Sequence, residues 1–150
     1  MRFVIQRVSE ASVKIDGAIY SEIQKGFLVL VGIEETDSKE DADWLCNKLI
    51  SLRIFSDAED KMNLSLQDIN GDVLLVSQFT LFASTKKGNR PSFIRSAKPD
   101  QAIPLYDNCI QQLSGLLNKP IKTGQFGADM KVSLINDGPV TILIDSKNRE

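Results

Sequence analysis

The first 33 residues carry the alternating pattern of half-buried β-strands. Apolar and polar side chains alternate over residues 3–5 and 13–15, with the period of two that turns one face of a strand toward a core. Asp16 and Gly17 separate two such segments and predict the tight turn of a β-hairpin. Residues 27–31 are continuously apolar, which indicates a strand buried on both faces.

Two later segments have the spacing of amphipathic helices, at about residues 38–50 and 100–117. Asp37 followed by Glu40 predicts a capping-box variant at the start of the first helix, and Asp100 is a candidate cap for the second. The apolar stripe of the first helix consists of Ala42, Leu45, Cys46 and Leu49. That of the second consists of Ala102, Leu105, Tyr106, Cys109, Leu113 and Leu116.

Short strand-like segments occupy much of the remaining chain. Asn70-Gly71 predicts a second hairpin, between NLSLQDI and DVLLVSQFTL. Further strand-like pieces lie at 52–55, 121–123, 130–135 and 140–145. Because strands outnumber helices and hairpins recur, we expect an α+β fold with a mixed, largely antiparallel sheet and about two main helices. The chain shows no internal repeat or boundary, so we expect residues 1–150 to form a single domain.

Composition narrows the possible chemistry. Of the 150 residues, 18 are basic and 20 acidic, and the net charge of −2 excludes nucleic-acid binding driven by overall charge, although not by a local patch. The chain has no histidine, which excludes Ser-His-Asp and Cys-His catalysis and imidazole metal sites. Cys46 and Cys109 can form neither a four-coordinate zinc site alone nor a disulfide framework, and we expect both in the core.

Two sequence features bear on localisation. The longest apolar run, residues 26–33, has eight residues, against the ~18 or more expected of a membrane span. The N-terminal sequence MRFVIQRVSE lacks the pattern of a signal peptide. We therefore expect a cytoplasmic protein with reduced cysteines and no membrane association.

A first candidate for chemistry is Ser77-Gln78-Phe79-Thr80-Leu81, which ends the apolar strand beginning at Val73. Burying an unpaired amide or hydroxyl costs ~1–3 kcal/mol, so this polar cluster needs partners or a function. On local evidence alone, the favoured interpretation is a strand that enters solvent, with Thr80 present for its β-propensity.

A second candidate is the segment NDGPVT at residues 136–141, between two apolar strands. Its Gly138-Pro139 pair removes one backbone donor and lets the backbone approach another group closely. An X-Pro peptide bond is also the kind that can be cis. Local evidence favours a plain hairpin turn.

A third candidate is the loop at residues 85–99 (TKKGNRPSFIRSAKP), which carries five positive charges and no acid. With Phe82 and Phe93 nearby, it has the pattern of a phosphate contact with stacking side chains. A solvated surface loop is the alternative. Phe126 and Met130 are most simply explained as core residues.

Four stretches of the chain resemble a single family. They are MRFVIQRVSEASV at 1–13, SQFTL at 77–81, RPSF at 90–93 and FGADMKVSLINDGPVT at 126–141. Together they closely resemble the D-aminoacyl-tRNA deacylases, in register from residue 1 to about 145. Phe82 stands where many members have Tyr, and residues 146–150 match nothing distinctive. The resemblance implies a sandwich- or barrel-like sheet, and a homodimer that uses no metal or organic cofactor.

The resemblance also implies the substrate and the site. The substrate is tRNA esterified at its 3′ end with a D-amino acid or glycine. The expected pocket floor is Ser77, Gln78, Phe79 and Thr80, with Phe126 and Met130 lining the same pocket. Gly138 and Pro139, joined by a cis peptide bond, would enter from the partner subunit and exclude L esters by steric conflict. The candidates for tRNA phosphate contacts are Lys86, Lys87, Arg90, Arg95 and Lys98.

Two mechanisms remain open for such a site. Thr80 is a possible nucleophile, but the sequence offers it no obvious base. Alternatively, water attacks with help from the terminal 2′-hydroxyl of the tRNA, and backbone amides near Phe79 and Thr80 hold the oxyanion. We favour the second mechanism, because an aminoacyl ester is already activated.

Two other functional classes stay in view. A non-catalytic RNA-binding module would use only the basic loop and its aromatic residues, and would bind tRNA without cleaving the ester. A structural protein would use Gly138 and Pro139 only as a dimer contact, so that variants there would lower association and nothing else.

Overall fold

The fold is built around one long N-terminal strand, in a computed structural model that describes residues 1–150. Strand β1 (Arg2–Ile15) pairs antiparallel with β2 (Ala18–Ile23), β3 (Gly26–Gly32) and β8 (Lys131–Asp145). On the other side of β3, strand β6 (Asp72–Ser77) and then β7 (Lys122–Thr123) are added in parallel. The result is a mixed six-stranded sheet, as expected of an α+β fold.

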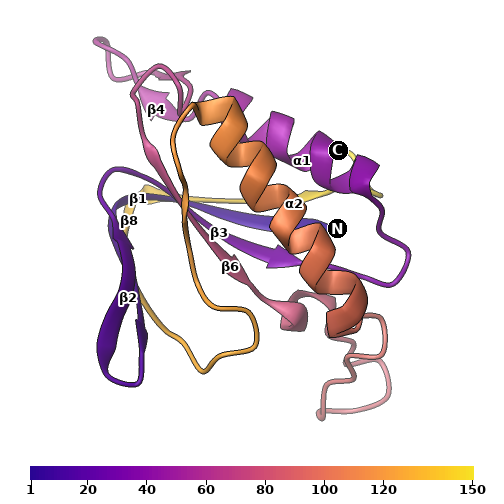
Figure 1. The fold of residues 1–150 in the computed structure, drawn as a ribbon. Helices are drawn as coiled ribbons and strands as arrows, with labels where there is room; N and C mark the ends of the chain where they lie inside the picture. Colours follow the sequence, from indigo (N-terminus) through magenta and orange to yellow (C-terminus); the bar gives the residue numbers. More distant parts are fainter.

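This sheet curls until its two ends approach each other. The strand order is β2-β1-β3-β6-β7, and the Ser21 hydroxyl of β2 donates a hydrogen bond of 2.7 Å to the Thr123 carbonyl of β7. A separate small hairpin of β4 (Phe55–Ser56) and β5 (Met62–Leu64) projects from the opposite end of the molecule (Figure 1). The architecture is therefore a nearly closed, barrel-like sheet.

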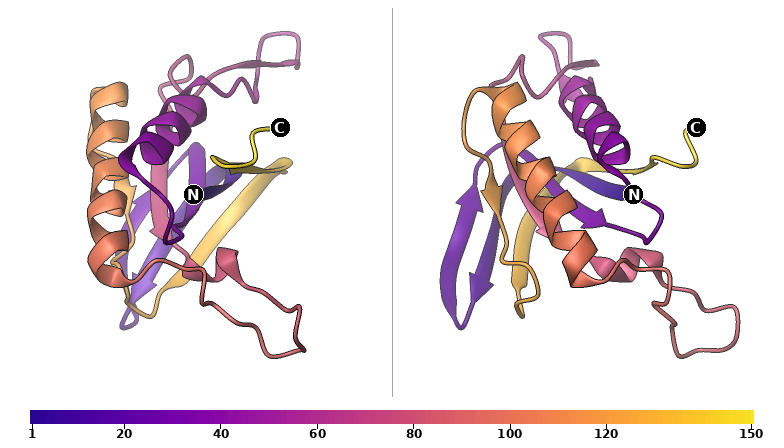
Figure 2. Two further views of the ribbon diagram at one scale, coloured as in Figure 1. Left: turned by 90° about the vertical axis from the view of Figure 1, so that its right-hand side faces the viewer. Right: turned by 45° about the vertical axis from the view of Figure 1, so that its right-hand side comes forward.

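Two helices cover one face of the sheet. Helices α1 (Lys39–Ser51) and α2 (Pro99–Leu117) lie side by side there, as the two views of Figure 2 show. The main core lies between helices and sheet, and a smaller apolar cluster fills the curled end of the sheet. Cys46 and Cys109 are fully buried where the helices meet, which confirms their prediction as core residues. Neither helix combines the length and apolar character needed to cross a bilayer.

The turn at Asp16-Gly17 is confirmed, whereas the hairpin predicted at Asn70-Gly71 is wrong. Both Asp16 and Gly17 have positive φ and connect β1 to its antiparallel neighbour β2. Asn70 also has positive φ, but β5 pairs with β4, and β6 pairs only in parallel. Residues 73–76 are buried, and such a strand is stabilised best between two neighbours inside the sheet.

The helix caps differ from the predicted ones. Helix α1 starts with a capping box of Ser38 and Asp41. The Asp37 carboxylate is used elsewhere, because it accepts hydrogen bonds from the N-terminal ammonium group and from the Glu34 N–H. Helix α2 begins at Pro99, so Asp100 lies in its first turn and does not cap it.

The predicted plain hairpin at residues 136–141 is also wrong. The segment lies within one continuous strand, β8, whose two halves both pair with β1. The irregularity at Gly138-Pro139 is matched by register shifts in β1 between Gln6 and Glu10. Because β1 is long enough to pair with both halves of β8, the chain continues in one direction through residues 136–141 and forms no hairpin.

Candidate active site

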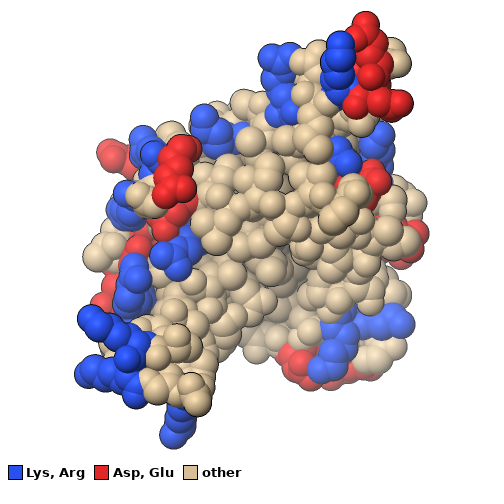
Figure 3. All heavy atoms as spheres, turned by 180° about the vertical axis from the view of Figure 1, so that it is seen from behind, with Lys and Arg blue, Asp and Glu red and all other residues tan.

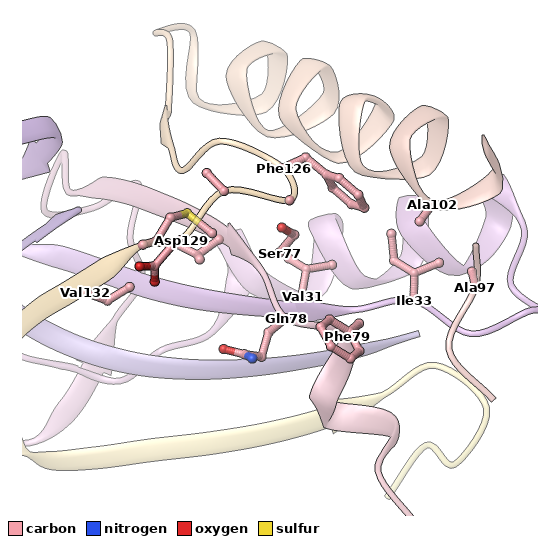
Figure 4. Close-up of a pocket in the computed structure, with 14 residues that line it drawn as sticks. Val31, Ile33, Ser77, Gln78, Phe79, Ala97, Ala102, Phe126, Asp129 and Val132 are labelled. Atoms are coloured by element: carbon pink, nitrogen blue, oxygen red, sulfur yellow. The ribbon is translucent and has the colours of Figure 1, made fainter. Parts of the chain in front are cut away.

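A pocket of about 340 Å³ opens where the ends of β3 and β6 meet the start of α2 and the segment leading into β8 (Figure 4). It lies at the junction of the two apolar clusters. Its wall is formed by Val31, Ile33, Val76, Ser77, Gln78, Phe79, Ala97, Ala102, Phe126, Gly127, Ala128, Asp129, Met130 and Val132. Most of these side chains are apolar, and Asp129 alone is charged.

The predicted floor residues are brought together at the end of β6. The Gln78 N–H donates to the Val31 carbonyl at 2.7 Å, which continues the parallel pairing one residue beyond the strand. The chain then turns through a short 3₁₀ segment, η1 (Phe79–Phe82). In Figure 4 the rings of Phe79 and Phe126 face the cavity from either side of Val31. SQFTL therefore forms a strand end followed by a turn, and the turn carries Phe79 to the pocket.

This turn leaves two adjacent backbone N–H groups unpaired. Within the turn, the Leu81 N–H donates to the Gln78 carbonyl and the Ala83 N–H to the Thr80 carbonyl. Phe79 and Thr80 open the 3₁₀ segment, where the first N–H groups have no acceptor inside the helix, and no loop carbonyl or side chain accepts a hydrogen bond from them. Two free donors on the exposed residues beside an apolar pocket can hold a carbonyl oxygen that gains negative charge.

Thr80 is adjacent to the pocket but is not part of its wall. Its Oγ1 accepts a hydrogen bond of 2.6 Å from Gln78 Nε2. An amide donor withdraws electron density from the hydroxyl oxygen, and no basic side chain is bonded to that hydroxyl. The geometry thus gives Thr80 none of the activation that a nucleophile requires.

Phe126 and Met130 line the pocket, as the resemblance implies, and also pack against the apolar clusters. The Phe126 ring lies 6.0 Å from that of Tyr106. Burial raises the pKa of the Tyr106 hydroxyl, which stays protonated and donates to the Leu75 carbonyl of β6 at 2.8 Å. Gly124 leaves room for Met130, because a Cβ at Gly124 would lie 2.5 Å from the Met130 sulfur.

Gly138 and Pro139 lie outside the pocket of their own chain, exposed in the middle of β8. Their peptide bond is cis, and Gly138 has a φ of +138°. Arg7 supports this segment: its Nε donates to the Asp137 carbonyl at 2.8 Å and its Nη1 to the Ile54 carbonyl at 2.6 Å. The dipeptide is therefore presented outward on a braced backbone.

The basic loop projects from the body of the protein. Figure 3 shows Lys and Arg side chains gathered at the lower left corner, where this loop lies (Figure 3). Lys86, Lys87, Arg90 and Lys98 are exposed and have no carboxylate within 4.0 Å. Arg95 differs from them, because its guanidinium pairs with Glu34 at 2.8 Å and lies near the Phe82 ring. Four of the five side chains predicted to contact phosphates therefore form no ion pair within the protein.

The roles of several residues near the site could not be predicted from the sequence. Arg7 occupies a position where the alternation of Phe3 and Ile5 calls for an apolar side chain, and that mismatch is the one local signal of its role. Arg2 donates to the Leu81 carbonyl of the turn and to Asp145. Ser96 donates to the Phe79 carbonyl. The last two contacts depend on tertiary structure and leave no pattern in the sequence.

An apolar pocket with two free amide donors and no basic side chain suits the hydrolysis of an ester that is already activated. Comparisons with known proteins agree with this class. The profile of the D-Tyr-tRNA(Tyr) deacylase family matches residues 4–145. A D-aminoacyl-tRNA deacylase of Flavobacterium johnsoniae is 63% identical over 150 residues, with all of both chains covered.

Two solved structures share the fold. One, named c-Myc DNA Unwinding Element Binding Protein, superposes with a TM-score of 0.92 at 39% identity, covering 97% of this chain and 98% of the other. The second, described as a probable eukaryotic D-amino acid tRNA deacylase, has a TM-score of 0.82 at 18% identity, with 95% and 97% covered. The chain belongs to the D-Tyr-tRNA(Tyr) deacylase family.

Proposed function

We propose that the pocket hydrolyses the ester of D-aminoacyl-tRNA and of glycyl-tRNA, completed by Gly138 and Pro139 of a second copy of the chain. Membership of the family gives the reaction, so the protein is a D-aminoacyl-tRNA deacylase, a hydrolase acting on an ester bond. The observation that carries the choice of site is the pair of unpaired N–H groups on Phe79 and Thr80 beside the pocket. We place the reaction in the cytoplasm, where charged tRNA is used.

In the proposed mechanism, water attacks the ester carbonyl and the terminal 2′-hydroxyl of the tRNA assists it. The amides of Phe79 and Thr80 stabilise the oxyanion, an effect of ~2.7–4 kcal/mol for one well-placed donor. The apolar wall strengthens that interaction by excluding water. The mechanism requires neither a side-chain base nor a cofactor.

Thr80→Ala should retain most of the turnover. The Thr80 hydroxyl accepts from Gln78 and has no base, whereas its backbone N–H survives the substitution. We expect a decrease of roughly tenfold or less, the size expected for one lost hydrogen bond, in single-turnover deacylation of D-tyrosyl-tRNA. Complete loss of turnover with unchanged tRNA affinity would identify Thr80 as the nucleophile and overturn the mechanism.

The role of Gly138 and Pro139 across a subunit interface explains two features of the fold. The dipeptide is exposed and lies outside the pocket of its own chain. The rear face of the molecule, in Figure 3, carries a broad area without charged side chains, and Ile135 and Leu143 of β8 are 54% and 61% exposed. A two-fold dimer through this face would place each dipeptide at the partner's pocket.

Such a dipeptide gives chirality by exclusion. A pocket that fixes the ammonium group and the carbonyl of the substrate leaves two directions for the side chain. Backbone held by Arg7 has little freedom to yield, so an L side chain directed toward it would clash. A D side chain takes the other direction, and glycine passes because it has none.

The basic loop should set the affinity for tRNA without affecting chirality. Replacing Lys86, Lys87 and Arg90 together by Ala removes three cations that form no ion pair within the protein, each worth a slope of ~0.9 or less in log Kd against log salt. We therefore expect weaker binding with a flatter salt dependence and an unchanged preference for D over L esters. An unchanged slope in filter-binding titrations would eliminate the loop as the phosphate contact.

A non-catalytic nucleic-acid-binding module is the second candidate. Two observations favour it, the basic loop and the relative named for binding a DNA unwinding element. It predicts that the purified protein binds tRNA and leaves both D and L esters intact. Release of the amino acid from the D ester distinguishes the two candidates directly.

A further inference from the structure

The basic loop is fastened directly to the turn that carries Phe79. The Ser96 hydroxyl donates a hydrogen bond of 2.8 Å to the Phe79 carbonyl. The Phe93 ring meets the Phe79 ring edge-on, with centroids 5.1 Å apart. Backbone bonds from Ala97 N to Ile33 O and from Glu35 N to Arg95 O hold residues 95–97 against the end of β3. The backbone on both sides of Ser96 is therefore fixed independently of the hydrogen bond between Ser96 and Phe79.

This contact acts on the peptide group that joins Phe79 to Thr80. In a planar trans peptide, the carbonyl of one residue and the N–H of the next point in opposite directions. A donor on the Phe79 carbonyl therefore fixes the direction of the Thr80 N–H, turning it away from the basic loop. It also polarises the peptide and makes that N–H a stronger donor.

We propose that Ser96 is a positioning residue for the reaction: through the Phe79 carbonyl it orients and strengthens the Thr80 N–H as an oxyanion donor. The inference rests on the proposed function, because it needs the oxyanion to form at this turn. The Ser96 hydroxyl makes its one hydrogen bond to the Phe79 carbonyl, and it is the one side-chain donor on that oxygen. Its effect should fall on the chemical step and leave tRNA binding unaltered.

Ser96→Ala tests the proposal, with Ser96→Thr as the conservative variant and Ser92→Ala as the matched control. Ser92 lies in the same loop and joins Ser84 through backbone bonds alone. For Ser96→Ala we expect kcat on D-tyrosyl-tRNA to fall roughly tenfold, the worth of one hydrogen bond, at unchanged KM. Ser96→Thr should restore kcat, and Ser92→Ala should match the original chain. The amide resonance of Thr80 should move upfield in Ser96→Ala alone.

The kcat values and the Thr80 amide resonance together decide whether Ser96 positions the Thr80 N–H. An unchanged kcat and an unmoved Thr80 resonance in Ser96→Ala overturn the proposal. Equal loss in Ser96→Ala and Ser92→Ala also overturns it, because the loop as a whole would then be responsible. If the original chain has no deacylase activity, the proposed function fails first. In that case the Thr80 resonance still reports whether Ser96 orients the peptide.

Discussion

Gly138→Ala should abolish most deacylation of D-aminoacyl-tRNA while leaving tRNA affinity unchanged. Gly138 has a φ of +138°, which residues with a Cβ rarely adopt. A Cβ there would lie 2.8 Å from Val140 Cγ2 and 2.9 Å from Arg7 Nη2. The backbone must shift to relieve these contacts, and a displacement of ~1 Å at a reacting centre can reduce the rate a hundredfold. Single-turnover kinetics on D-tyrosyl-tRNA measure the effect.

Gly17→Ala is the matched control for this variant. Gly17 also has a positive φ, of +78°, but nothing within 4 Å of an added Cβ, and it lies in the turn between β1 and β2, outside the basic loop. It therefore carries backbone strain without the contacts. If both variants lose activity equally, general strain is responsible, and the assignment of Gly138 to the site fails.

Mixed dimers test whether Gly138 acts on the partner's pocket. Ala128→Phe should block a pocket by adding a ring to its wall and should be inactive alone. Refolding it together with Gly138→Ala gives heterodimers in which one of two sites combines an open pocket with an intact glycine. We expect activity to reappear in the mixture. Continued inactivity, with heterodimers present by native mass spectrometry, would place Gly138 and the pocket in the same chain.

Arg7→Met should reduce both stability and activity. The Arg7 side chain is buried, with 8% of the residue exposed, and two of its nitrogens donate to carbonyls of Asp137 and Ile54. Methionine fills much of the space but leaves both carbonyls without this donor, at ~1–3 kcal/mol for each unsatisfied group. Because Asp137 is exposed, water can partly replace one of the two donors. We therefore expect the free energy of unfolding to fall by about 2–4 kcal/mol and deacylation to fall with it.

Urea unfolding and single-turnover kinetics measure the two effects of Arg7→Met. Arg53→Met is the control, because Arg53 is an exposed arginine for which we expect a change within about 0.5 kcal/mol. Loss of stability with full activity would show that Arg7 braces the fold and has no part in presenting the dipeptide. No change in either would contradict the structural role.

The sequence predicts the helices and strands of this fold better than it predicts which strands pair with one another. Alternation at residues 3–5 and 13–15 and the apolar run at 27–31 identify strands, and the helical spacing identifies both helices, because burial of one face is a local pattern. Asn70-Gly71 marks a turn correctly, yet a turn signal does not say which strands it joins. The neighbours of β6 are decided by its burial between β3 and β7, which are distant in the sequence.

The same limit applies to the candidate site. Ser77, Gln78 and Phe79 meet Phe126 and Met130 at the pocket, as the family resemblance implies, whereas Thr80 lies outside its wall. Other contacts could not be predicted, because they join segments that are distant in the sequence. These contacts are the pairing of Arg95 with Glu34 and the hydrogen bonds of Arg7 and Ser96. Residues 146–150 show the same effect: Lys147 pairs with Asp41 at 2.9 Å, although nothing in that segment is distinctive.

Deacylation of matched D- and L-tyrosyl-tRNA by the purified protein, with EDTA present, tests the central claim most directly. The proposed site predicts rapid release of tyrosine from the D ester and sparing of the L ester, without a metal requirement. Release from both esters at similar rates would contradict chiral exclusion by Gly138 and Pro139. Release from neither, with tRNA still bound, would contradict the deacylase assignment and leave a nucleic-acid-binding module.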